Sequence, residues 1–257
     1  MSLKSGAVGT IVLIAISACG GGPGPVAPED VVRTLTQEFH TKSIVFRFSA
    51  GDAVEANRQQ AFHDWVTGQL GIGLPSKLTY YKYNGRTQMQ ALTGRATNGF
   101  AEPSAYAVHS IFPYDGHEAV HVYSALVGRP SNFFNEGIAV ALNVDPAASR
   151  WAPPWNGTHV YAHTQLLVRT NQIKPLSSII TTSAFRELDT WVGYGEAGSF
   201  VLFLIEQHGI GRMLSFFRTS SQNDSLARIE GNIQSNWGMS LVEVEAAWLA
   251  FINDWSG

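Results

Sequence analysis

Two histidines one helical turn apart constrain this chain more than any other feature of its sequence. His117 and His121 lie in the run HEAVH, with Glu118 between them. If the run is helical, residues four apart share a face, so both imidazoles can reach one metal ion. Apolar residues within and after the run indicate a helix, and Gly128 followed by Pro130 predicts its end.

A third metal ligand is needed, because a catalytic zinc normally has three protein ligands and one open position. Glu136 follows His121 by fifteen residues, in the apolar run FFNEGIAVAL. We expect Ser131 to cap a second short helix there, folded back on the first by a tight turn. Glu136 would then face the histidines, and Gly137 would let the two helix backbones approach closely. The predicted metal ligands are His117, His121 and Glu136.

An alternative reading needs no metal. In it, His117 and His121 are an ordinary pair on a partly buried helix, with neighbouring carbonyls as hydrogen-bond partners. A short pattern such as HExxH also arises by chance, so the motif alone is weak evidence and the downstream Glu136 strengthens it.

HEAVH followed by NEG resembles the gluzincin metallopeptidases, the thermolysin-like class in which two histidines of HExxH and a downstream glutamate hold zinc. The short spacing is similar to that of small bacterial domains called peptidase MA-like. Two later runs, WVGYGEAGSFVLFLIEQHGIGRMLSFF and GMSLVEVEAAWLAFI, are similar to further landmarks of those domains. The resemblance implies an α+β, zincin-like fold: an N-terminal lobe with a small mixed sheet plus helices, the HExxH helix, and a C-terminal helical lobe.

The same resemblance implies roles for particular residues. One zinc ion would activate a water for hydrolysis of a peptide bond, with Glu118 as the general base. Tyr194 would donate a hydrogen bond to the oxyanion, with His159 as the alternative donor. A strand at Thr97–Ala101 would pair with an extended substrate backbone. A packing role for Tyr194 at a helix entrance remains the alternative.

Two other functions are compatible with these residues, because a motif reveals neither a substrate pocket nor activity. One is a lipid-anchored binding or scaffold protein of gluzincin fold that turns over nothing. The other is hydrolysis of a non-peptide amide, such as a cell-wall crosslink, by the same metal chemistry.

The first 19 residues are typical of a bacterial lipoprotein signal peptide. Lys4 precedes an apolar run that is shorter than the roughly 20 residues of a membrane-spanning helix. Cys19 ends a segment that resembles a lipobox, so we expect export, lipidation of Cys19 and attachment to a membrane; a plain signal peptide is the alternative. Gly20 in place of aspartate favours the periplasmic face of the outer membrane or the cell surface.

Composition limits the remaining possibilities. Residues 20–29, rich in glycine and proline, predict a flexible tether, and residues 30–257 predict one metallopeptidase domain. The chain has 45% hydrophobic and 14% charged residues, which indicates a compact globular domain. The net charge of −3 without a basic cluster argues against a nucleic-acid partner, and the single cysteine excludes an intramolecular disulfide. We expect a monomer.

Periodicity and turn signals predict the main elements. Asp52 is expected to start a helix, and residues 193–195 are expected to form a mobile turn before a helix that opens at Glu196. The predicted helices are 28–40, 52–70, 158–171, 196–209 and the apolar run LVEVEAAWLAFINDW, and the predicted strands are 43–49, 77–83, 96–101 and 105–112.

Three further histidines are candidate ligands. His109 precedes His117 by eight residues on a predicted strand, and we interpret it as structural. His159 and His163 repeat the spacing of four, but no acidic third ligand lies nearby in the sequence. A second metal site is therefore not expected.

Overall fold

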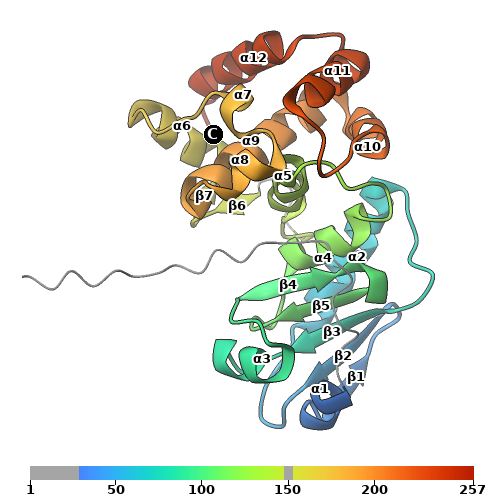
Figure 1. Cartoon of the computed structure of the whole chain (residues 1–257). Helices are drawn as coiled ribbons and strands as arrows, with labels where there is room; N and C mark the ends of the chain where they lie inside the picture. The colour runs from blue at the N-terminus through green and yellow to red at the C-terminus, as the bar shows by residue number, and fades with distance from the viewer. Residues whose placement is uncertain (1–28, 148–152) are drawn as a thin grey trace, which may run out of the picture.

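The computed structural model describes residues 29–147 and 153–257, which form a region around a sheet and a helical region (Figure 1). The predicted signal peptide, Cys19 and nearly all of the predicted tether lie outside the described residues. The described part of the chain is a mixed α+β structure, as the sequence predicts. None of the helices in the described ranges combines the length and the hydropathy that a bilayer-spanning segment needs.

A five-stranded mixed sheet forms the N-terminal half, in the order β1-β2-β3-β5-β4. The three inner strands are parallel, and the two edge strands β1 and β4 run antiparallel to their neighbours. The strands are β1 (Gln37–His40), β2 (Ile44–Phe48), β3 (Leu78–Lys82), β4 (Gly99–Glu102) and β5 (Ala107–Ser110). This order leaves one edge of β4 unpaired within the sheet.

Helices cover both faces of this sheet (Figure 1). The face that carries Phe46, Tyr80 and Val108 packs against α2 and α4 in the main core. The opposite face packs against α1 and α3 in a smaller core around Tyr83 and Phe100. The helices of this half are α1 (Glu29–Thr34), α2 (Ala56–Leu70), α3 (Arg86–Thr93), the 3₁₀ turn η1 (Pro103–Ala105) and α4 (Gly116–Ser124).

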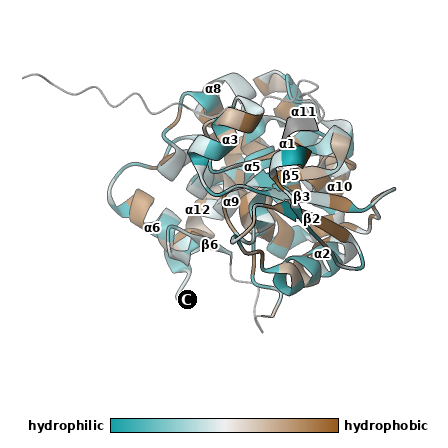
Figure 2. Ribbon diagram, turned by 90° about the horizontal axis from the view of Figure 1, so that it is seen from below, coloured by the Kyte–Doolittle hydropathy of each residue, from teal (hydrophilic) through white to brown (hydrophobic). Residues whose placement is uncertain are grey.

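The C-terminal half is helical and is arranged around the long helix α9, which packs along α5. Figure 2 shows hydrophobic segments concentrated in the middle of the molecule and hydrophilic ones towards its outside. The elements are α5 (Asn132–Leu142), β6 (Pro154–Trp155), β7 (Thr158–His159), α6 (Val160–Arg169), α7 (Leu176–Ile179), α8 (Thr182–Arg186), α9 (Thr190–His208), α10 (Ile210–Thr219), α11 (Leu226–Trp237) and α12 (Leu241–Asp254).

The last helix follows its sequence signals closely. Ser240 and Glu243 form a capping box, in which each side chain accepts from the other residue's backbone N–H. The apolar stripe of α12 is buried, and Trp248 donates from its indole Nε1 to Ser199 Oγ at 3.0 Å. Buried tryptophans normally find such an acceptor.

Several predicted boundaries are wrong. The predicted helix 28–40 ends at Thr34, and the chain continues as β1, because β2 offers an edge to pair with. Asp52 does not start α2, since its carboxylate accepts from Lys82 Nζ at 2.7 Å and the helix begins at Ala56. Helix α3 was not predicted, because its apolar stripe is short.

The predicted turn at residues 193–195 is also wrong. These residues lie inside α9, which begins at Thr190 and is capped by Asp189. The glycines there serve close packing: a Cβ at Gly195 would lie 2.3 Å from the His163 ring, and one at Gly193 would lie 3.2 Å from Leu188. Glycine thus admits neighbouring side chains against the helix backbone.

Glu196 on α9 leads to a pH-dependent prediction. Its side chain is fully buried, Oε1 accepts from the backbone N of Lys174 at 2.9 Å, and Oε2 has no hydrogen-bond partner among the described residues. Burial raises the pKa of this carboxyl from 4.5 to about 8. The folded state therefore binds a proton more tightly than the unfolded state does, so stability falls as the pH rises from about 4.5 to 8.

Glu196→Gln should remove this dependence, because glutamine keeps the oxygen acceptor and cannot ionise. With about 1.36 kcal/mol per pKa unit, we expect the variant to be more stable than wild type by about 3 kcal/mol at pH 7, by about 4 kcal/mol at pH 8, and nearly equal at pH 4.5. Urea denaturation across this pH range measures the difference. A constant difference at all pH values would contradict the prediction.

Candidate metal centre

Helix α4 presents the two histidines, and its start is fixed by buried hydrogen bonds. Asp115 is the N-cap, and its Oδ1 accepts from the backbone N of Glu118 at 3.1 Å. Asp115 Oδ2 accepts from Ser110 Oγ at 2.7 Å, and Gln59 Oε1 accepts from the backbone N of Asp115 at 3.0 Å. The cap therefore ties the helix to β5 and α2. It also sets the direction in which His117 and Glu118 project.

Helix α5 presents Glu136 from its second turn. Ser131 occupies the N-cap position as predicted, but its hydroxyl donates to the carbonyl of Ile180 at 2.6 Å. Thr182 supplies the cap instead, accepting from the backbone N of Asn132 at 3.0 Å. The helix start is thus anchored to α8, which lies about fifty residues later.

Gly137 has a different role from the one predicted. It was expected to bring α4 and α5 together, but its close neighbour is α9. A Cβ at Gly137 would lie 2.6 Å from the carbonyl oxygen of Ala197 and 2.6 Å from Cγ2 of Val201. Gly198 is the reciprocal contact, since a Cβ there would lie 2.2 Å from Cγ1 of Val140. These two glycines set the close approach of α5 and α9.

The three predicted ligands converge on one point between α4 and α5. The Nε2 atoms of His117 and His121 are 3.2 Å apart, and they lie 3.2 Å and 3.1 Å from Glu136 Oε2. Ligand atoms about 2.0–2.1 Å from a tetrahedral zinc ion are separated by about 3.3–3.4 Å, so this triangle is close to the size that such an ion requires. Among the described residues, His117, His121 and Glu136 form a group of side chains that could hold a metal ion.

Burial and charge also suit a cation site. The side chains of His121 and Glu136 are almost completely buried, whereas His117 retains 18% exposure and opens the cluster to solvent. Burial alone would raise the pKa of Glu136, but attraction to His121 and hydrogen bonds from both histidines hold it far below its usual value. Burial lowers the pKa of His121, but Glu136 reverses this and raises it to about 9. Glu136 is therefore firmly anionic, as a candidate metal ligand should be.

Some polar atoms next to the three predicted ligands have no hydrogen-bond partner among the described residues. Metal-bound histidines usually donate their second ring N–H to an acceptor, which fixes the ring. His121 Nδ1 is buried without a hydrogen-bond partner among the described residues, and Ser124 Oγ on the same helix shares this condition. Among the described residues, the polar contact that orients the His121 ring is therefore that of Nε2 with Glu136, and Nδ1 provides none.

Glu118 lies beside the cluster, between α4 and the edge strand β4. A Cβ at Gly99 would lie 2.9 Å from both Glu118 Cγ and Asp115 Oδ2, so only glycine fits at this point of β4. Glu118 Oε2 is buried and has no hydrogen-bond partner among the described residues. Burial, followed by the nearby Asp115 carboxylate, raises the pKa of Glu118 to about 7. General bases work best with a pKa near the working pH.

Tyr194 lies next to a ligand histidine. Its ring stacks on His117 with centroids 6.0 Å apart, and its other ring neighbours are Trp155 at 5.6 Å and Phe185 at 5.7 Å. It projects from the second turn of α9 rather than from a loop. Trp155 and Phe185 were not predicted to lie near the metal cluster. Neither residue belongs to a sequence motif that would indicate this position.

The remaining histidines lie in other surroundings. His159 precedes α6 as its N-cap, accepts from the backbone N of Tyr161 and stacks on Trp255 with centroids 4.7 Å apart. His163 lies within α6, and its Nε2 is 2.8 Å from the carbonyl of Trp191. His159 is not helical, so the spacing of four does not place this pair on one helix face. A second metal site was not expected there.

His109 is buried on β5 in the smaller core. Its Nδ1 is 2.7 Å from the Tyr83 hydroxyl, and its ring stacks on Phe100 and Tyr81 with centroids 4.3 Å and 4.7 Å away. This environment agrees with the predicted structural role. The sheet alternation places His109 on the α1 and α3 side, away from the face that packs on α4.

Comparison with known proteins adds no assignment. A scan against protein-family models finds no match, and a search of curated proteins finds none either. The geometry of the cluster is therefore the basis of the functional proposal.

Two residues near the site were missed in the sequence. Asp115 stands three residues before Glu118, a spacing typical of an N-cap, and this signal could have been recognised. Gly99 carries no such signal. Only glycine fits at this position because α4 packs against β4 there, and the sequence does not reveal that contact.

Proposed function

We propose that this protein is a zinc-dependent peptidase of the gluzincin type with a zincin-like fold. The observation behind the proposal is the triangle of His117, His121 and Glu136, built from two helices, with a buried glutamate beside it. Two imidazoles and one carboxylate form a common ligand set of catalytic zinc. When bound, zinc would lower the pKa of a coordinated water to about 7 and polarise a substrate carbonyl.

Glu118 is the proposed general base. It follows His117 directly on α4 and has a buried carboxylate oxygen without a hydrogen-bond partner among the described residues. A positioned carboxylate can take a proton from water and pass it to the leaving amine. Asp115 and Gly99 hold this side chain in place from two sides, through the helix cap and the contact with β4.

Tyr194 is the proposed oxyanion donor. Its ring lies against His117, and a phenol is a hydrogen-bond donor suited to a developing negative charge. His159, the alternative, caps α6 and stacks on Trp255, whereas Tyr194 lies against His117, and this position favours Tyr194.

The substrate is proposed to bind along β4. This strand is at the edge of the sheet, and no other strand of the described residues pairs with its outer side, where a peptide could form main-chain hydrogen bonds. Gly99 and Ala101 are the small residues of β4, and a Cβ at Gly99 would touch Glu118. An extended peptide added to this edge would pass close to Glu118, which favours a peptide over a compact substrate. The expected edge, Thr97–Ala101, overlaps the observed strand Gly99–Glu102.

Metal content tests the ligand assignment. We expect about one zinc per purified wild-type chain, and a loss of zinc affinity of about 100-fold or more in Glu136→Gln, because a neutral amide is a poor zinc ligand. Competition with a chromophoric chelator measures the affinity. Glu187→Gln, an exposed glutamate on α8's C-cap, is the matched control and should retain zinc. Equal affinity of wild type and Glu136→Gln would refute the site.

Digestion of an unbiased peptide library separates a peptidase from an inactive binding protein. The zinc-loaded chain should cleave peptides, cleavage should stop with a chelator, and it should return with added zinc. Zinc binding without any cleavage would favour the scaffold alternative. Cleavage that persists in the chelator would exclude the metal mechanism. The attachment to a membrane through Cys19 remains a separate prediction.

A further inference from the structure

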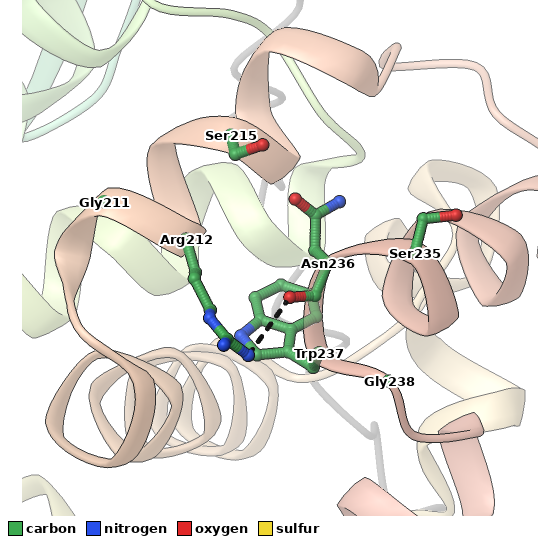
Figure 3. A pocket seen from close by; sticks show the side chains of 7 residues that line it. All are labelled: Gly211, Arg212, Ser215, Ser235, Asn236, Trp237 and Gly238. Carbon is green, nitrogen blue, oxygen red and sulfur yellow. Dashed lines mark hydrogen bonds between the residues drawn. The ribbon is translucent and has the colours of Figure 1, made fainter.

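A polar pocket lies on the helical half, at the start of α10 and the end of α11 (Figure 3). Its volume is about 570 Å³. None of the residues that line it is acidic, and it shares no residue with the metal cluster. The lining residues are Gly211, Arg212, Ser215, Ser235, Asn236, Trp237 and Gly238.

Trp237 is one of the lining residues, and its buried indole N–H lacks a partner among the described residues. Its indole packs on Phe216 with ring centroids 5.2 Å apart, and only 5% of the residue is exposed. The indole N–H can only donate, and a buried donor without an acceptor destabilises the folded protein. A ligand that brings an acceptor would remove that destabilisation.

Arg212 brings a positive charge beside the indole (Figure 3). The side chain is exposed, and its Nη1 donates to the carbonyl of Asn236 at 3.5 Å, which is long for a hydrogen bond. Within the described ranges, no carboxylate forms a salt bridge with Arg212. The guanidinium can therefore turn towards a ligand at little cost, and its planar donor fork matches a carboxylate.

Arg212 is the dominant charge at the pocket, because the partial charges of the two helix ends there offset each other. The positive end of α10 lies close to the negative end of α11, so the two dipoles offset each other. One arginine that forms no salt bridge with a described carboxylate matches an anion of charge −1. The hydroxyls of Ser215 and Ser235 and the amide of Asn236 provide further polar contacts around it.

We propose that this pocket binds the carboxylate of a small organic acid. The guanidinium of Arg212 holds the two carboxylate oxygens, and the ligand supplies the acceptor that the Trp237 indole N–H lacks. The ligand displaces the long bond from Arg212 to Asn236 and lies over the indole. The site is independent of zinc and of Glu118.

The indole N–H of Trp237 reports binding directly. In ¹⁵N-labelled protein with zinc bound, its resonance is identified by its absence from Trp237→Phe. We expect a saturable downfield shift with N-acetylglycine and none with N-acetylglycinamide, which has the same shape without the charge. The indole of Trp248 is bonded to Ser199 and should not move, which makes it an internal control.

Arg212→Gln should weaken N-acetylglycine binding at least tenfold, while Arg218→Gln, an exposed arginine on the same helix, should leave it unchanged. Equal shifts with the acid and its amide would overturn the proposal, as would the absence of a shift with the acid. A shift with inorganic phosphate but not with N-acetylglycine would overturn the assignment to carboxylates. Peptide hydrolysis should be the same in both arginine variants, so this test is separate from that of the metal centre.

Discussion

Replacing Glu118 by glutamine is expected to lower peptide hydrolysis by about 10²- to 10⁴-fold, the range that positioned acid–base groups contribute. Glutamine has nearly the same shape but cannot accept a proton from water. Because Glu118 is not one of the three converging ligands, the variant should still bind about one zinc per chain. The measurement is kcat/KM on a cleaved peptide, with zinc content determined on the same sample.

Two outcomes would contradict this assignment. Full activity in Glu118→Gln would mean that another group is the base, and loss of zinc would mean that Glu118 supports the metal site instead. Glu187→Gln is the matched control, since it makes the same chemical change at an exposed position. It should leave both kcat/KM and zinc content unchanged.

Replacing Gly137 by alanine is expected to destabilise the fold by about 2 kcal/mol, the upper end of the overpacking cost less the gain in helix propensity. In an open helix this change would stabilise by about 1 kcal/mol through helix propensity. Here the added methyl group would lie 2.6 Å from the carbonyl oxygen of Ala197, which is backbone and cannot turn away. Overpacking of this kind typically costs 1–3 kcal/mol or more. Because Glu136 is the preceding residue, zinc affinity should fall as well.

Urea denaturation of the metal-free protein measures the stability change. Gly68→Ala is the matched control, because Gly68 lies in α2 with open space where the Cβ would be placed. It should be neutral or stabilising by up to about 1 kcal/mol. If Gly137→Ala were as stable as this control, the close contact between α5 and α9 would be wrong.

Local sequence signals predicted a large part of the helical structure. The HEAVH helix, the NEG helix after Ser131 and the final helix were expected close to where they occur. Their signals are caps, apolar stripes and glycine or proline stops, all of which act within one or two turns. The relative position of His117 and His121 could be predicted in the same way, because both lie within one turn of the same helix. Glu136 could be added because only a short turn separates its helix from theirs.

Other features depend on partners that are distant in the sequence. The segment at β1 has a helical pattern in part, yet pairing with β2 makes it a strand. Tyr194 was placed in a turn, because Gly193 and Gly195 are turn formers when nothing is known of the side chains packed against them. The structure instead buries both glycines inside α9, against residues of other elements.

The sequence by itself determined the residues of the candidate metal cluster: two imidazoles on one helix face, a glutamate between them and a carboxylate one turn into the next helix. Only the tertiary structure decided that these atoms lie 3.1–3.2 Å apart, that β4 runs beside Glu118 and that Gly137 faces α9. The physical reason is range. Helix spacing and capping are set by neighbours a few residues away, whereas convergence and packing depend on contacts between distant segments.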